Sequence, residues 1–401
     1  MKRGHLETNI LVLVTLGLVA FGMVMVYSAT SASAAIGGGN PAYYLKRQGI
    51  YALLGVVLLV AASRWNYRSL RHLAPALVLG SLVLLVVVLA GGESINGARR
   101  WIQVGGVTFQ PSELAKLALG VWTALFLARR PVPRTLGELT KPIGLLSAAF
   151  CALILAEPDL GTVIVLCLIV GAMLVVAGAP VRMLGSASAI VGAVILFAIW
   201  FEPYRRTRIF SFINPWHDAQ GAGYQQVQSM IGMGSGGFFG VGLGESVQKI
   251  FYLPEARTDM IFAIVGEELG LVGVTLVVAA YAAFAWAGLR IALGCRDPFG
   301  KALAAALTAL VCGQAALNLA AVVGIAPLTG IPLPLVSYGG TSLVVVLTAV
   351  GILLNIARSD GIELAQVRDR RRRDGRSRDA VARRRGSASR PRRQRDLRRF
   401  A

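Results

Sequence analysis

Ten apolar runs, most of them close to the length that crosses a membrane, are the feature that most limits how this chain can fold. A spanning helix needs about 20 apolar residues, and it satisfies its own backbone polar groups where lipid offers no water. With 55% hydrophobic and 15% charged residues, the chain is predicted to be an all-α polytopic membrane protein with about ten transmembrane helices. The runs lie near residues 10–29, 48–63, 73–91, 112–128, 142–156, 160–178, 183–201, 260–289, 302–326 and 338–357.

The distribution of Lys and Arg between short loops predicts the orientation, because cytoplasmic loops are enriched in these residues. The short loops of one side carry only Lys46, Arg47, Arg99 and Arg100. Both termini are therefore predicted to lie on the opposite, cytoplasmic side. The cations of that side, ahead of the tail, are Lys2, Arg3, Arg64, Arg68, Arg71, Arg129, Arg130, Arg134, Lys141, Arg182, Arg290, Arg296 and Lys301.

The composition changes after residue 357. Residues 1–357 form the predicted transmembrane domain, with a long extracytoplasmic loop at about 202–259 between the seventh and eighth helices. Residues 358–401 hold 17 Arg and 6 acidic residues, a net charge of +11. We predict that this Arg-rich tail is disordered, cytoplasmic and held near anionic lipids. Nucleic acid is not an expected partner.

The second outer loop, near 92–111, leads into a span that carries two ionisable residues. Pro111 suits the first turn of a helix, which makes Glu113 and Lys116 neighbours three residues apart, just inside the membrane. A charge at that depth is a functional candidate by default, and a structural ion pair between helices is the alternative. Arg99 and Arg100 precede this helix as candidates for binding an anionic headgroup or for anchoring the chain at the interface.

The third outer loop is only Glu157-Pro158-Asp159. Two carboxylates on so short a turn must stay close to the membrane surface. Asp159 is a candidate site residue, and it is equally a candidate for capping the helix that follows.

The long outer loop ends at Asp259, where the eighth helix begins. Thr258 or Asp259 could cap that helix. Glu267 and Glu268 lie about two turns further along, and charges inside a span need partners or water. The pattern therefore predicts a polar cavity below Asp259, with Glu267 as a supporting residue. Nearby, Gly266 and Gly270 match the GxxxG pattern of close helix contacts.

Other sequence patterns limit the cofactors and substrates that this protein is expected to use. Residues 232–237 match GxGxxG, but no strand precedes them, so a dinucleotide site is not expected. The four Cys and three His lack metal-ligand spacing. The sequence indicates no cofactor and leaves a divalent-metal requirement open. Carboxylates and arginines at an outer membrane surface suit a substrate with an anionic head and an apolar tail. A transporter is the alternative, because intramembrane Glu and Lys also form proton relays.

Eight motifs, in order, resemble those of the SEDS proteins, the shape, elongation, division and sporulation peptidoglycan polymerases. The chain is more similar to FtsW, the division member, than to RodA, the elongation member, at residues 224–229 and 248–256. It departs from the family at Arg257, where His is expected. The motifs are ARRWI at 98–102, FQPSELAK at 109–116, EPDLGT at 157–162, GYQQVQS at 223–229, GSGGFFGVGLGES at 234–246, LPEARTD at 253–259, GEELG at 266–270 and PLVSYGGTS at 334–342.

The resemblance implies an enzyme that polymerises lipid II onto a lipid-linked glycan chain at the outer face of the membrane, with undecaprenyl pyrophosphate as the leaving group. It implies that Asp259 is the essential carboxylate, supported by Glu113, Lys116 and Asp159. Arg99 and Arg100 become candidate pyrophosphate-binding residues. A lipid II flippase and an elongation polymerase are the alternatives.

The resemblance also implies partners and a location. The expected partner is a class B penicillin-binding protein, a transpeptidase that crosslinks the new strand, together with other division proteins. The expected location is the bacterial cytoplasmic membrane at the division septum.

Overall fold

Each of the ten apolar runs corresponds to a helix in the computed structural model, which describes residues 5–36, 40–95, 98–104, 107–250 and 252–359. Within these ranges, nine helices have the length and composition to cross a membrane. The tenth run is α4 (Pro111–Arg129). The predicted fold class is thereby confirmed. Residues up to Ala357 form one compact unit, and the predicted disordered tail from Arg358 lies outside the described residues beyond Ser359.

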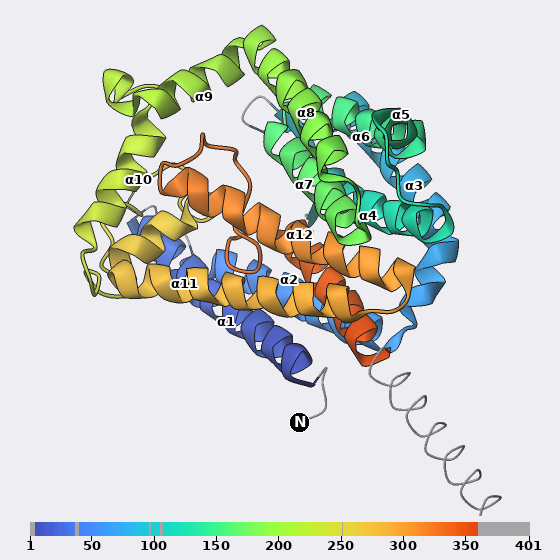
Figure 1. Cartoon of the computed structure of the whole chain (residues 1–401). Helices are drawn as coiled ribbons and strands as arrows, with labels where there is room; N and C mark the ends of the chain where they lie inside the picture. Colours follow the sequence, from blue (N-terminus) through green and yellow to red (C-terminus); the bar gives the residue numbers. More distant parts are fainter. Residues whose placement is uncertain (1–4, 37–39, 96–97, 105–106, 251, 360–401) are drawn as a thin grey trace, which may run out of the picture. The chain divides into compact units, whose positions relative to one another are not determined.

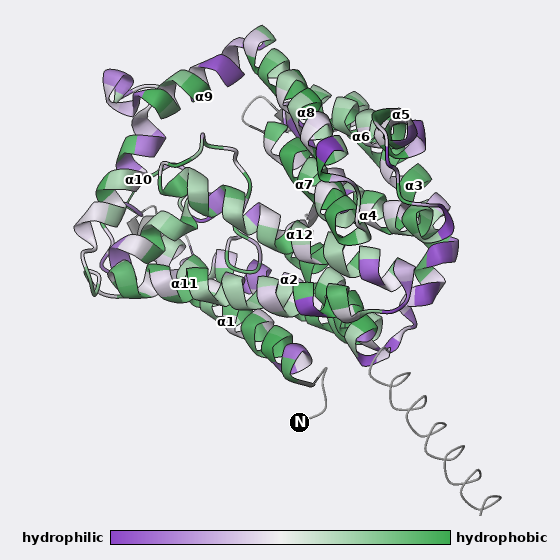
Figure 2. Ribbon diagram, viewed as in Figure 1, coloured by the Kyte–Doolittle hydropathy of each residue, from purple (hydrophilic) through white to green (hydrophobic). Residues whose placement is uncertain are grey.

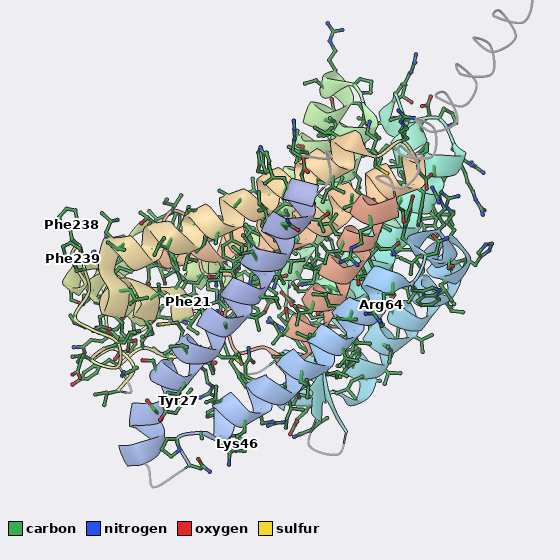
Figure 3. All side chains as sticks on the ribbon, turned by 90° about the horizontal axis from the view of Figure 1, so that it is seen from below. Phe21, Tyr27, Lys46, Arg64, Phe238 and Phe239 are labelled. Atoms are coloured by element: carbon green, nitrogen blue, oxygen red, sulfur yellow. The ribbon has the colours of Figure 1, made fainter. Side chains whose placement is uncertain are left out.

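The other long helices are α1 (His5–Ile36), α2 (Tyr43–Arg64), α3 (Leu70–Gly91), α6 (Leu145–Ala156), α7 (Leu160–Ala177), α8 (Val181–Phe201), α11 (Ile261–Gly294) and α12 (Pro298–Val322), followed by a C-terminal helix, Gly340–Ser359. A 3₁₀ turn (Tyr67–Ser69) precedes α3, and α5 (Leu136–Leu139) with a π-helical turn (Thr140–Gly144) leads into α6. Figure 3 shows Lys46 and Arg64 at the two ends of α2.

The interior is built around α12, which packs against α4, α7 and α11, while α1 packs along α11 (Figure 1). In the apolar stretch of the C-terminal helix, 89% of the residues are buried inside the protein, whereas in that of α8 the share is 0%. Apolar side chains thus cover both the interior and the outward faces of the helices, and hydrophilic residues gather toward helix ends (Figure 2). That distribution suits a helix bundle surrounded by lipid, because such helices need no polar face toward water.

Local signals place several helix ends. Pro111 occupies the first turn of α4, where its missing N–H removes no helix hydrogen bond. Asp159 caps α7, and Gly178 ends it with a left-handed backbone (φ 86°). Asp297 caps α12 at the other end of the bundle, where Arg71 also donates to its carboxylate.

The loop before α4 folds into a small antiparallel sheet of β1 (Glu93–Ile95), β2 (Ala98–Val104) and β3 (Val107–Phe109). Arg99 pairs with Ser94 on β1, and Ile102 pairs with Phe109 on β3. No strand was expected here from the sequence. Trp, Ile and Val in β2 favour extended backbone, but the strands are too short to show a periodic signal.

The long loop between α8 and α11 lies where it is predicted, and it is largely helical. It contains α9 (Pro203–Ile213), a 3₁₀ turn (Pro215–Asp218) and α10 (Tyr224–Ser235), which packs against α11. Past α10, Phe238 and Phe239 point away from the helices (Figure 3).

A break in α11 explains why glycines occur on both sides of the contact between α11 and residues 236–242. Gly270 has φ 61°, so the helix is interrupted there. The carbonyl groups of Glu267 and Glu268 accept hydrogen bonds from the N–H groups of Val241 (3.0 Å) and Gly242 (3.1 Å) instead. A Cβ on Gly236 would lie 1.9 Å from the Gly266 carbonyl oxygen. Gly266 and Gly270 therefore serve a close contact within the chain itself.

Candidate active site

A cavity of about 550 Å³ lies among the N-terminal ends of α4 and α7, β2, α9 and the segment before α11. It brings together parts of the chain that are far apart in sequence. Four of the seven predicted site residues line it: Arg100, Glu113, Asp159 and Asp259. The rest of the lining comes from Trp101, Thr108, Gln110, Pro158, Thr162, Glu202, Tyr204, Arg208, Glu255, Arg257, Thr258, Gly330, Ile331, Pro332, Tyr338, Gly339, Gly340 and Ser342.

The half-buried Asp259 faces this cavity from the residue before the α11 cap. Asn318 Nδ2 donates to the Asp259 main-chain oxygen (2.7 Å), which ties this backbone to α12. The N-cap of α11 is Met260, without a side-chain cap hydrogen bond. The capping alternative for Thr258 and Asp259 is therefore wrong, and the Asp259 carboxylate is not used to hold the helix end.

The surroundings of Asp259 favour proton exchange near neutral pH. Burial, and then the charge of Glu255, raise the pKa of Asp259 to about 6, while Arg208 opposes this shift. Thr258 Oγ1 donates to the carboxylate at 3.3 Å. A Cβ placed on Gly330 would lie 3.8 Å from Arg208 Nη1 and 4.0 Å from Asp259 Oδ2, so the glycine leaves space beside both groups. A carboxylate with such a pKa suits a general base.

Two of the arginines that line the cavity are fixed by main-chain carbonyls. Arg208 Nη1 donates to Leu328 O (3.0 Å), and its guanidinium lies 4.8 Å from the Tyr204 ring centroid. Arg100 donates through Nε to Glu157 O (2.8 Å) and through Nη2 to Pro158 O. Neighbouring residues on a strand face opposite sides, so Arg100 lines the cavity whereas Arg99 is exposed and outside the lining.

Glu113 and Lys116 form a buried ion pair, as their spacing predicts. Lys116 Nζ lies 2.8 Å from Glu113 Oε1 and 2.9 Å from Gln314 Oε1 on α12. Both charged side chains are almost fully buried, and Glu113 lines the cavity while Lys116 lies behind it. Glu113 Oε2 has no hydrogen-bond partner among the described residues. The pair therefore joins α4 to α12 and leaves one buried carboxylate oxygen of Glu113 without a partner.

Asp159 has both of its predicted positions at once. It lines the cavity, and it caps α7 by accepting from Thr162 N (3.0 Å) and Thr162 Oγ1 (2.8 Å). Its neighbour Glu157 is fully buried, and within the described structure neither of its carboxylate oxygens has a hydrogen-bond partner. Burial and then the charge of Asp159 raise the pKa of Glu157 to about 8, against the opposing charge of Arg100. Glu157 is thus largely uncharged at neutral pH.

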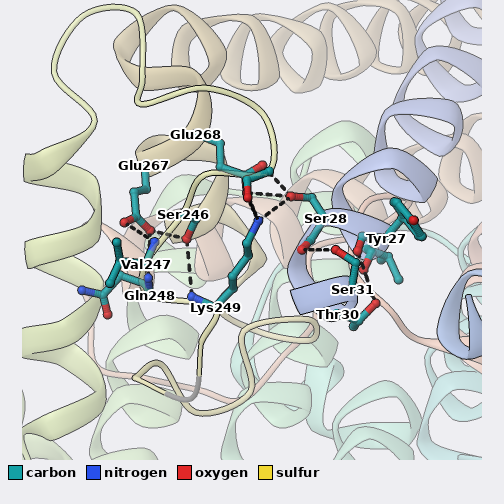
Figure 4. Close-up of polar contacts among 12 residues, drawn as sticks. Tyr27, Ser28, Thr30, Ser31, Ser246, Val247, Gln248, Lys249, Glu267 and Glu268 are labelled. Carbon is teal, nitrogen blue, oxygen red and sulfur yellow. Dashed lines mark hydrogen bonds and ion pairs between the residues drawn. The ribbon is translucent and has the colours of Figure 1, made fainter. Parts of the chain in front are cut away.

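The carboxylates of Glu267 and Glu268 have their hydrogen-bond and ion-pair partners outside this cavity (Figure 4). Glu267 accepts from Ser246 Oγ and from the N–H groups of Val247 (3.0 Å) and Gln248 (3.4 Å). Glu268 pairs with Lys249 (2.9 Å) and accepts a hydrogen bond from Ser28 Oγ on α1 (2.6 Å), so these residues form one buried cluster.

A cavity is present at Asp259 as predicted, but Glu267, expected to support it, does not line it. The carboxylates of Glu267 and Glu268 are instead bound by residues 246–249 and by Ser28 of α1. Arg208, Glu255 and Arg257 also line the cavity. They were not predicted as site residues, because nothing in their local pattern separates them from the other charges of the long loop. In the described part of the chain, no group of three or more His, Cys, Asp and Glu is placed to hold a metal ion.

A family profile, curated sequences and solved structures all show similarity to the same family of proteins. A profile of the FtsW, RodA and SpoVE cell cycle proteins matches residues 8–361. A probable peptidoglycan glycosyltransferase FtsW from Geobacter sulfurreducens is 41% identical over 351 residues, covering 87% of this chain and 94% of that protein. Stage V sporulation protein E from Bacillus subtilis is 40% identical over 358 residues, covering 87% and 96%. A solved peptidoglycan synthase complex that coordinates polymerization and crosslinking contains a chain with TM-score 0.73 and 30% identity, covering 87% and 97%.

Proposed function

Because this chain belongs to the FtsW, RodA and SpoVE family of cell cycle proteins, we propose that it is a peptidoglycan glycosyltransferase. It polymerises lipid II into glycan strands at the outer face of the bacterial cytoplasmic membrane. The observation that carries the proposal is Asp259, a carboxylate with a pKa near 6 that faces a cavity of about 550 Å³ and caps no helix.

In the proposed reaction, Asp259 accepts the proton of the attacking sugar hydroxyl of lipid II. The hydroxyl oxygen bonds to the anomeric carbon of the lipid-linked chain, and the bond from that carbon to the diphosphate breaks. One displacement with inversion completes the transfer, and undecaprenyl pyrophosphate leaves with the bonding electrons. The base must come within about 2.6–3.2 Å of the hydroxyl oxygen. The half-buried position of Asp259 at the cavity wall supports this role.

We propose supporting roles for the other charged residues. Glu113 and Asp159 shape the cavity wall through their links to Lys116 and Thr162. Arg100 holds the turn at 157–158 in place through its two carbonyl contacts. Arg99, exposed on the opposite face of β2, is positioned to meet a lipid headgroup rather than the reacting sugars.

The test is polymerisation of labelled lipid II by the purified full chain with its partner. Asp259→Asn keeps the size and polar contacts of the side chain and removes the base, so the rate should fall by about 10²–10⁴-fold while lipid II binding persists. Asp218→Asn is the matched control, because Asp218 lies in the same loop and does not line the cavity.

Near wild-type polymerisation by Asp259→Asn would place the base elsewhere, with Glu113 and Asp159 next to test. Leaflet exchange of lipid II without polymer would favour a flippase, for which the intramembrane Glu113–Lys116 pair is the motivating observation.

We further propose that the chain acts in division, at the septum, with a class B penicillin-binding protein and other division proteins. The similarity to a complex that couples polymerization to crosslinking supports the transpeptidase partner. Both termini are proposed to be cytoplasmic, with the Arg-rich tail near anionic lipids. Co-purification in mild detergent, with low polymerase activity for the isolated chain, is the expected result, and full activity of the isolated chain would remove the need for the partner.

A further inference from the structure

A second cavity, of about 340 Å³, adjoins the active-site cavity. Both cavities are lined by Glu255 and Arg257, so they meet at this turn. Asp259, two residues further on, lines only the first cavity. The other residues of the second cavity are Ala29, Lys249, Leu253, Pro254 and Ala256.

Arg257 differs from the other arginines of the active-site cavity in the state of its donors. Arg100 and Arg208 donate to main-chain carbonyls. Arg257 donates no hydrogen bond to any described residue, and its Nε is buried without an acceptor. A buried donor left without an acceptor carries an uncompensated desolvation penalty. A ligand that brings anionic oxygens to this guanidinium would remove that penalty.

The position of Arg257 is fixed although its donors are unused. Its guanidinium lies 4.4 Å from the ring centroid of Tyr44, and the Tyr44 ring meets Tyr338 edge-on at 5.3 Å. Tyr338 N donates to the Arg257 main-chain oxygen (2.9 Å). Contacts of both its main chain and its guanidinium therefore hold Arg257 in one orientation. A fixed guanidinium suits phosphate, which it can bind through two parallel hydrogen bonds.

Among the charged residues that line the second cavity, Arg257 is the cation available to a ligand. Lys249 is buried and neutralised by Glu268 at 2.9 Å. Glu255 is exposed and accepts a hydrogen bond from Thr258 Oγ1 (2.9 Å). The rest of the lining is apolar, contributed by Ala29, Leu253, Pro254 and Ala256. The chemistry therefore matches a compact anion attached to an apolar chain.

We propose that the second cavity binds the diphosphate of a lipid-linked sugar through Arg257. The inference rests on the proposed function and extends it, because it separates the two reacting groups between two cavities. The acceptor hydroxyl lies in the first cavity beside Asp259, and the donor diphosphate lies at the junction with the second. Arg257 then stabilises the charge that develops on the diphosphate as the bond to the anomeric carbon breaks.

The test measures binding separately from catalysis. The probe is a fluorescent short-chain polyprenyl diphosphate, titrated into the purified full-length protein in detergent. Arg257→Gln should weaken binding about ten- to a hundredfold, the range for loss of charged hydrogen bonds. Arg206→Gln is the matched control and should bind as wild type, because Arg206 is also half-buried beside an aromatic ring but lines neither cavity.

Arg257→His adds a readout that a purely structural role would not change. An imidazole gains its charge below a pKa of about 6.5, so this variant should bind the probe tightly at acidic pH and weakly at alkaline pH. Wild type, with a permanent charge, should show only the weaker pH dependence of the probe itself. Inorganic diphosphate should compete with the probe in wild type, and a failure to compete would show recognition of the lipid alone and overturn the proposal.

The two claims fail separately. If wild type polymerises lipid II but neither Arg257 variant changes probe binding, the diphosphate site is wrong and the proposed function stands. If wild type makes no polymer while Arg257→Gln still weakens binding, the proposed reaction is wrong and the diphosphate site stands.

Discussion

The rate of glycan synthesis should increase with pH through a midpoint near 6, because Asp259 accepts a proton only when it is ionised. Burial and the charge of Glu255 raise the pKa of this carboxyl from 3.8 to about 6. A group with that pKa is about 9% ionised at pH 5 and about 91% ionised at pH 7, so kcat/KM should increase about tenfold over this interval.

Glu255→Gln tests the cause of the shift. The substitution removes the negative charge that disfavours ionisation of Asp259, so the midpoint should move to lower pH and the rate at pH 5 should become a larger fraction of the rate at pH 7. The amide can still accept the hydrogen bond from Thr258. Glu138→Gln, at an exposed carboxylate on α5 outside both cavities, should leave the midpoint unchanged.

The assay is the initial rate of polymer formation from labelled lipid II, measured from pH 5 to pH 8 at constant ionic strength. The reasoning would be refuted by a midpoint that stays in place in Glu255→Gln, or by a residual activity of Asp259→Asn that keeps the wild-type pH dependence.

Three further outcomes are expected. A reporter fused after Arg358 should be active only in the cytoplasm, and one inserted near Ala219 only outside; the reverse would invert the topology. Depletion in a rod-shaped host should give filaments, whereas rounded cells with intact septa would indicate an elongation role. Lys249→Met should lower the free energy of unfolding by about 3–5 kcal/mol, because it leaves the buried Glu268 carboxylate unpaired. Thermal unfolding measures this, with Arg290→Gln, at an exposed ion pair, changing it by less than about 1 kcal/mol.

The helices could be predicted from the sequence because the signal is local. A run of about 20 apolar residues specifies a span by itself, and Pro111 and Asp159 mark helix starts within one turn of their own position. The Glu113–Lys116 pair follows from spacing on one helix. Each of these inferences needs only neighbouring residues.

The site required contacts that no local pattern contains. Glu268 meets Lys249 and, across 240 positions of sequence, Ser28, so the placement of its charge could not be read from α11 alone. Arg99 and Arg100 look equivalent as a pair of cations, and only the strand that carries them sends one into the cavity. The family resemblance selects Asp259 but does not reveal the unused donors of Arg257, which depend on Tyr44 and Tyr338.

The glycines around the break in α11 have a consequence for how this protein can change over generations. A Cβ on Gly240 would lie 2.0 Å from the Glu268 carbonyl oxygen, and one on Gly270 would lie 2.4 Å from Gly240 N. Each collision is with a main-chain atom, which every amino acid carries, so no second substitution at the neighbouring residue can relieve it. A lineage that loses either glycine should regain fitness by reversion at the same codon, and a screen for suppressors should return true revertants almost alone.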